Sequence, residues 1–102
     1  MKVTAPNELE LKFDRLADRW RAETAHLSRL DSVYLNFDYQ QIIGMGDVAL
    51  PFIFKALSDK SERWFWALKA ITGHEPHKGA EGVSMEEMRT AWLTWGSEHG
   101  LL

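Results

Sequence analysis

Residues 46–73 read GDVALPFIFKALSDKSERWFWALKAITG, and this stretch decides which fold the sequence predicts. Asp47 is a suitable N-cap for a helix from Val48 to about Leu57, because its side chain can accept hydrogen bonds from the first free backbone N–H groups. Pro51 lies in the first turn of that helix, where its missing N–H costs little. The helix is apolar nearly all round, which predicts a central position covered on several sides.

A second helix is predicted directly after the first. Ser61 is its expected N-cap, its body runs from Glu62 to Thr72, and Gly73 ends it, since glycine tolerates the left-handed conformation at a helix terminus. Only Ser58–Lys60 separate the two helices. So short a connection favours an antiparallel hairpin.

Upstream of the hairpin, a long amphipathic helix is predicted from about Glu8 to Arg29. Asn7 and Glu10 have the spacing of a capping box at its start. Its apolar residues share one stripe of the helical wheel: Leu9, Phe13, Leu16, Trp20 and Leu27. Residues 1–6 are predicted to be a flexible tail in front of a single helical domain at 7–102.

The segment between this helix and the hairpin gives a weaker pattern. Residues 31–37 combine β-branched, aromatic and turn residues without helical periodicity, so no helix is predicted there. Asp38 is the expected cap of a short helical turn through Ile43, which Gly44 and Gly46 end.

The last predicted helix has the clearest start signal of the chain. A loop is expected from Gly73 to Val83, and Ser84 and Glu87 then form a capping box. The helix continues to about His99, and no segment of the sequence shows a convincing strand pattern. The predicted fold class is therefore all-α, a compact single-domain bundle of about five helices around the hairpin.

The hairpin sequence resembles a single HEAT-type repeat. The segments that carry the resemblance are GDVALP at 46–51, the apolar helix that follows, and ALKAITG at 67–73. In that family the first helix begins just after a glycine or an acidic cap and often carries an early proline. A solenoid needs about three repeats to be stable, and one is visible here. The resemblance therefore implies a local HEAT-like hairpin, a scaffold commonly used for protein contacts.

A wider pattern is similar to a family of small uncharacterised bacterial all-helical proteins. The segments that carry it are ETAHLS at 23–28, YQQIIGMG at 39–46, WFWAL at 64–68, ITG at 71–73 and WLTWG at 92–96. The resemblance implies a prokaryotic, cytoplasmic setting. It carries over no functional residue.

The composition excludes several classes of protein. The 102 residues carry 12 Lys and Arg against 15 Asp and Glu, a net charge of −3, whereas proteins that bind nucleic-acid backbones usually show a basic excess. The longest uncharged apolar run, Val48–Phe54, has seven residues, and a membrane helix needs roughly 20. Residues 1–10 lack the apolar segment of a signal peptide. The absence of cysteine excludes disulfide scaffolds and thiol catalysis. We expect a cytoplasmic protein that does not enter a membrane, and its charge argues against nucleic-acid binding.

Aromatic residues make up 12% of the chain and include five tryptophans, most of which we expect in the core. Trp66 is the exception, because on a helix it lies about 200° from Trp64. Either another helix also covers that side, or Trp66 stands on an exposed patch that anchors a partner. The predicted partner-binding residues are Trp66, Arg63, Glu62 and Trp95.

The first predicted helix also has a basic flank. Lys12, Arg15 and Arg19 lie on one side of its apolar stripe, and acidic residues lie on the other. An alternative interpretation is therefore a nucleic-acid-associated regulator that uses these three cations. The simpler interpretation is a solvated helix with i,i+4 ion pairs, each worth about 0.2–0.5 kcal/mol.

No arrangement of residues predicts catalysis. His74 and His77 supply two ligands in a Gly/Pro loop, whereas a zinc site needs three or four placed by a rigid scaffold, so a solvated loop is the favoured interpretation. No nucleophile elbow or phosphate loop is present. We therefore expect no enzyme activity, no cofactor and no metal. The sequence predicts a non-enzymatic protein–protein interaction module, a bacterial adaptor or neutralising partner, that binds a protein or self-associates.

Overall fold

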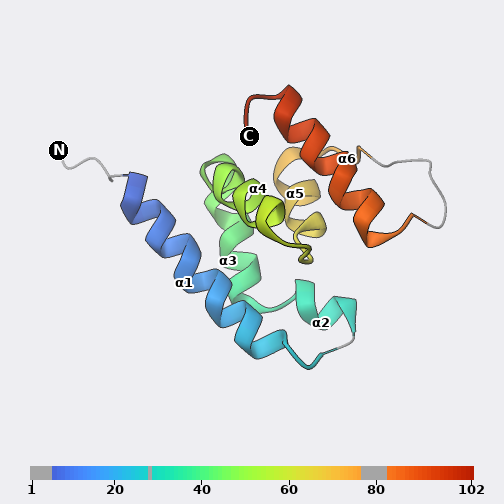
Figure 1. The fold of residues 1–102 in the computed structure, drawn as a ribbon. Helices are drawn as coiled ribbons and strands as arrows, with labels where there is room; N and C mark the ends of the chain where they lie inside the picture. Colours follow the sequence, from blue (N-terminus) through green and yellow to red (C-terminus); the bar gives the residue numbers. More distant parts are fainter. Residues whose placement is uncertain (1–5, 28, 77–82) are drawn as a thin grey trace. The chain divides into compact units, whose positions relative to one another are not determined.

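The computed structural model describes residues 6–27, 29–76 and 83–102, and across these ranges it contains helices and turns but no strand (Figure 1). The all-α prediction is confirmed. Where about five helices were expected, the described residues form six α-helices and one 3-10 turn. In chain order these are α1 (Pro6–Thr24), α2 (Leu30–Tyr34), α3 (Phe37–Met45), η1 (Gly46–Ala49), α4 (Leu50–Asp59), α5 (Phe65–Thr72) and α6 (Met85–Glu98).

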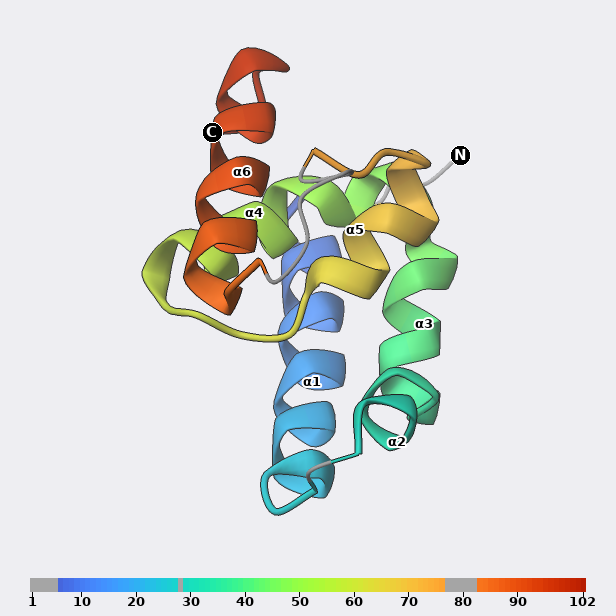
Figure 2. The same cartoon turned by 90° about the vertical axis from the view of Figure 1, so that its right-hand side faces the viewer.

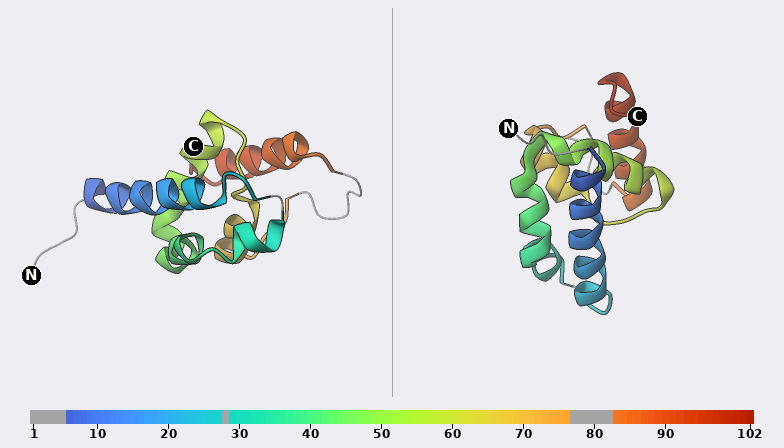
Figure 3. Two further views of the ribbon diagram at one scale, coloured as in Figure 1. Left: turned by 90° about the horizontal axis from the view of Figure 1, so that it is seen from below. Right: turned by 90° about the vertical axis from the view of Figure 1, so that its left-hand side faces the viewer.

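The chain divides into two compact units, Met1–Ala49 and Leu50–Leu102. In the first unit α1 and α3 lie side by side and antiparallel, and α2 connects them at one end (Figure 2; Figure 3). In the second unit α6 packs against both α4 and α5, and each of these packings is more extensive than that of α4 on α5. The single domain at 7–102 and the HEAT-type relationship stay predictions. The predicted tail is one residue too long at its end, because Pro6 already belongs to α1; residues 1–5 lie outside the described residues.

Helix α1 buries the predicted stripe but ends earlier than expected. Phe13, Leu16 and Trp20 are buried. The helix stops at Thr24, whose Oγ1 donates to the carbonyl of Trp20 (2.7 Å), a side-chain bond that competes with continued helix. Leu27 therefore lies beyond the helix end and is 36% exposed.

The prediction that residues 31–37 contain no helix is wrong. Helix α2 occupies most of this segment, although five residues are too few to form a stable helix alone. A tertiary contact compensates, because Val33 is buried and its carbonyl accepts a hydrogen bond from Trp20 Nε1 (3.1 Å). The cap of α3 is Asn36, whose Oδ1 accepts from the backbone N–H of Tyr39 (3.1 Å), and not Asp38, which is buried inside the helix.

Helices α4 and α5 occur where the two helices of the predicted hairpin were expected, but both start later, and they pack less on each other than on α6. Helix α4 begins at Leu50 and not at Val48, and Asp47 lies inside η1 instead of capping the helix. Pro51 lies in the first turn of α4, as predicted, after the short η1 turn. Helix α5 begins at Phe65 and not at Glu62, because residues 62–64 form a tight turn in which the Trp64 N–H donates to the Glu62 carbonyl (2.9 Å). Ser61 does not cap α5; its hydroxyl is hydrogen-bonded to the carboxylate of Glu86.

Both termini of the loop between α5 and α6 are as predicted. Gly73 ends α5 with a φ of 74° and a ψ of 10°, a left-handed conformation that favours glycine. At the start of α6, Ser84 Oγ accepts from the Glu87 N–H (3.1 Å), and Glu87 Oε1 accepts from the Ser84 N–H (3.3 Å). The predicted capping box is confirmed.

One apolar stretch bears on the membrane prediction. The run Phe37–Asp59, which joins α3, η1 and α4, has 23 residues and is long and apolar enough to cross a membrane by length and composition alone. A core helix of a soluble protein passes the same test. Gly46 also interrupts the run with a φ of 71° and a ψ of −148°. The uncharged run of seven residues considered above was therefore too narrow a criterion, and a cytoplasmic location stays a proposal.

Candidate interaction surfaces

Trp66 is exposed, which decides between the two alternatives that the sequence left open. Trp66 lies on the outer side of α5 and is 44% exposed. Trp64, two residues earlier, is completely buried. Lys69 Nζ lies 5.6 Å from the centre of the Trp66 ring, within cation–π range. The same ammonium group pairs with Glu75 Oε1 at 2.7 Å. The exposed indole is thus held beside an ordered cation.

Glu62 and Arg63 do not share an open helical face with Trp66. The helical wheel assumed a helix from Glu62, but both residues precede α5. The Glu62 side chain is only 11% exposed, lies 4.0 Å from Lys60 Nζ and accepts a hydrogen bond from Trp64 Nε1 (3.3 Å). Arg63 is half-buried. Of these two predicted partner-binding residues, Glu62 is held in the turn before α5 by its contacts with Lys60 and Trp64.

Trp95, the fourth predicted partner-binding residue, belongs to an aromatic cluster within the second unit. Its ring stacks on the His99 ring with centroids 3.9 Å apart and on the Phe54 ring at 6.0 Å. Trp92 meets it edge-on at 5.6 Å, and His74 lies at 5.4 Å. Trp95 is therefore half-buried among neighbours of its own unit. It lacks the exposure that makes Trp66 a candidate anchor.

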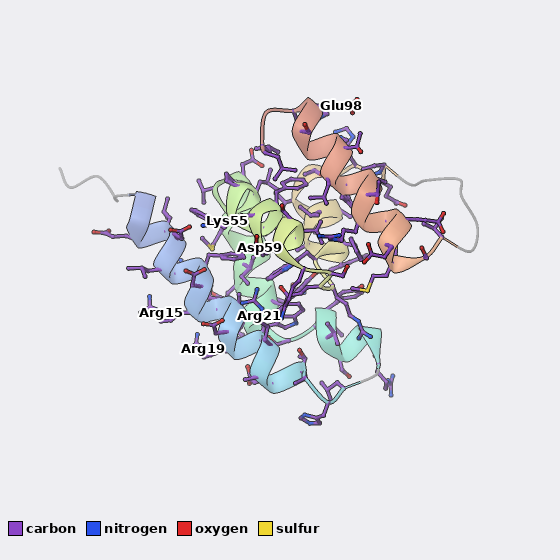
Figure 4. The ribbon with its side chains drawn as sticks, viewed as in Figure 1. Arg15, Arg19, Arg21, Lys55, Asp59 and Glu98 are labelled. Carbon is purple, nitrogen blue, oxygen red and sulfur yellow. The ribbon has the colours of Figure 1, made fainter. Side chains whose placement is uncertain are left out.

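The basic flank of α1 is exposed, but one of its three members has a structural partner. Arg15 and Arg19 project to one side of α1 and Arg21 to the other (Figure 4). Arg19 Nη2 lies 2.9 Å from Oδ1 of Asp38, a side chain that is 9% exposed, so Arg19 ties α1 to α3. Lys12 and Arg15 remain exposed on α1.

Sequence reasoning missed the two most exposed large apolar residues in the described part of the chain. Leu35 is 71% exposed and Phe37 is 72% exposed. They flank Asn36, the N-cap of α3, and lie at the junction of α2 and α3. The sequence LNF carries no local signal of this exposure, since an apolar residue before an N-cap often packs against the helix that follows. Residues 31–37 were moreover assigned no helix, so no helical wheel was applied to them.

The described residues contain no group of three or more His, Asp or Glu side chains that could hold a metal ion. His77, the second histidine of the predicted loop pair, lies outside the described residues. His74 itself packs against the Trp95 ring.

Comparison with known proteins adds no family to these observations: no family model, no curated protein and no solved structure matches the chain.

Proposed function

We propose that this protein is a non-enzymatic helical protein–protein interaction module of the bacterial cytoplasm, an adaptor or a neutralising partner of a more basic protein. The observation that carries the proposal is the 44% exposure of Trp66 next to a fully buried Trp64. Two tryptophans separated by one residue thus lie in different environments, one in the core and one on the surface.

The physical argument rests on the energetics of binding by large aromatic residues. Tryptophan is enriched among the residues that dominate interface energies, because it buries a large area at a small cost in rotamer entropy. Lys69 lies over the Trp66 ring and is itself paired with Glu75, which restricts the indole before any partner arrives. Such preorganisation lowers the entropy cost of association.

The charge of the chain supports a basic partner. With a net charge of −3, the protein is attracted electrostatically to a partner of opposite sign, which raises the association rate at low salt. We propose that such a partner provides an apolar pocket for the Trp66 indole.

The test compares Trp66→Ala with Trp64→Ala. Partners that the wild-type chain captures are identified by mass spectrometry, and their affinities for purified wild-type and variant proteins are measured by calorimetry. We expect Trp66→Ala to weaken binding by about 2 kcal/mol or more, roughly thirtyfold. It should lower the free energy of unfolding by about 1 kcal/mol or less, whereas truncation of the buried Trp64 should cost about 3–5 kcal/mol. Unchanged affinity of Trp66→Ala, or a stability loss as large as that of Trp64→Ala, would contradict the proposal.

The alternative function is a nucleic-acid-associated regulator, and the exposure of Lys12 and Arg15 on α1 favours it. It predicts binding that weakens steeply with salt and is lost when Lys12 and Arg15 are changed to Glu. Arg19→Glu is not a clean variant, because it also breaks the ion pair with Asp38. No binding to DNA or RNA at low salt would remove this alternative.

A further inference from the structure

The junction of α2 and α3 presents an apolar surface that the proposed function does not use. We call Leu35 and Phe37 the apolar corner; they are 71% and 72% exposed. Isolated exposed leucines are common, but here two large apolar side chains of this exposure lie two residues apart in the sequence, which needs a reason.

The backbone beneath the apolar corner is held rigidly. Asn36 Oδ1 accepts from the Tyr39 N–H (3.1 Å), and Gln40 Nε2 donates to the Tyr34 carbonyl (2.7 Å). The rings of Tyr34 and Tyr39 lie 5.6 Å apart beneath this turn. The corner is thus presented on a fixed frame, which reduces the entropy lost when a partner covers it.

The surface that continues from the corner along α3 is uncharged. The exposed residues of α3 are Phe37, Gln40, Gln41 and Gly44, which share one side of the helix. From residue 32 to residue 46 the one side chain charged at neutral pH is Asp38, and this side chain is buried and paired with Arg19. Charged residues make up 26% of the chain, so an exposed helix side without any charged residue is unusual in this protein.

Gly44 gives a second, independent observation on the same surface. A Cβ at this position would meet no heavy atom within 4 Å, so the protein's own fold does not require glycine there. Glycine inside a helix is less stable than alanine. Its small size instead leaves room for a second helix to approach the α3 backbone closely, as small residues do at helix crossings.

We propose that this surface, Leu35, Phe37, Gln41 and Gly44, binds the same surface of a second copy of the chain across a two-fold axis. In such a contact the residues near the axis meet copies of themselves, so any charge there would face an identical charge. A rigid, uncharged, apolar surface satisfies this requirement, whereas the charged outer side of α1 does not. The contact does not involve Trp66, so it stands or falls separately from the proposed function.

The test is sedimentation velocity of the untagged chain from about 10 μM to about 1 mM, a range that covers weak reversible dimers. The expected mass rises from 11.8 kDa towards twice that value. Phe37→Arg should weaken the dimer at least tenfold, because it places a charge against its own copy. Leu11→Arg is the matched control, since Leu11 is also exposed, at 61%, but lies on α1, and it should leave the dimer unchanged.

Gly44→Ala separates a contact effect from a folding effect. Alanine should raise the melting temperature, because it favours helix and meets no neighbour, and yet weaken the dimer, because its methyl group occupies the space of the second helix. A wild-type chain that stays monomeric at every concentration overturns the proposal. So does a dimer that Phe37→Arg leaves intact, or one that Phe37→Arg and Leu11→Arg weaken equally, because another surface or general charge would then be responsible.

Discussion

Both units of this chain contain buried tryptophan, but they differ in whether the polar groups of their cores have hydrogen-bond partners. In the first unit the indole N–H of Trp20 donates to the carbonyl of Val33, and the buried carboxylate of Asp38 pairs with Arg19. These bonds link α1 to α2 and α1 to α3. The first unit is therefore specified by directional hydrogen bonds between its helices.

The core of the second unit depends on close fit, while Arg89 joins α6 to α4 outside that core by donating from Nε and Nη2 to the carbonyls of Leu57 and Ser58 (2.8 and 2.9 Å). The indole N–H of Trp92 is buried and has no hydrogen-bond partner within the described ranges. Beside it, the Phe54 ring fits against Gly96 so closely that a Cβ at Gly96 would lie 2.8 Å from Phe54 Cε1. A helical glycine is used here because a larger residue would displace the ring. The two cores therefore differ in one respect. The buried polar groups of the first unit are paired between helices, whereas the core of the second unit leaves the Trp92 N–H without a partner in the described residues and depends on the fit at Gly96. Each core should fail under a different kind of substitution.

The largest expected effect is that of Trp92→Ala in the second unit. It removes a fully buried side chain that contacts Phe54 and Trp95, so the free energy of unfolding in urea should fall by about 3–5 kcal/mol. Trp92→Phe is the matched control, because it removes the unpaired N–H while keeping an aromatic ring, and it should cost clearly less. Equal losses in the two variants would mean that a smaller aromatic ring preserves none of the packing at this position, and the predicted difference between them would fail.

A smaller effect is expected when Gly96 becomes alanine. The added methyl group collides with the Phe54 ring, and overpacking of this kind costs about 1–3 kcal/mol. Gly44→Ala is the control in the first unit, where the same change meets open space and should stabilise the helix by up to about 1 kcal/mol. Thermal unfolding of both variants measures the difference, and a shift of the same sign in both would refute the close fit at Gly96.

The smallest effect tests the hydrogen-bonded unit. Arg19→Met leaves the carboxylate of Asp38 buried without its partner, and we expect a loss of about 1 kcal/mol, at the low end for bonds to charged groups because the Arg19 side chain is 61% exposed. Arg21→Met removes a surface pair with Asp18 and should change stability by less than about 0.5 kcal/mol. Urea unfolding distinguishes the two, and equal values would mean that the pair between α1 and α3 has no special weight.

The sequence predicted those features that depend on local chemistry. The end of α5 at Gly73 and the capping box of Ser84 and Glu87 need only a few neighbouring residues, so the all-α class and these boundaries were accessible. Helix α2 and the start of α5 were not, because each depends on a residue distant in sequence. Val33 is held by Trp20, and Ser61 is drawn away from its capping role by Glu86.

The residues of the candidate surfaces also differ in whether local sequence or a distant contact determines their exposure. The sequence placed Trp66 on the side of its helix away from Trp64 but left open whether another helix covers it, and the structure shows it exposed. Glu62 was misplaced by the helical wheel, since the helix begins three residues later. Leu35 and Phe37 were missed because their exposure depends on α2, whose formation requires the tertiary contact at Val33.

The central claim is that the exposed apolar residues of this chain serve association and not folding. The most direct test is light scattering behind size exclusion on the untagged wild-type protein, repeated over a wide range of loading concentrations. We predict an average mass that rises above 11.8 kDa as the concentration increases and returns to that value on dilution. A mass of 11.8 kDa at every concentration would contradict association through the α3 surface, while the proposed binding of a different protein through Trp66 would still stand.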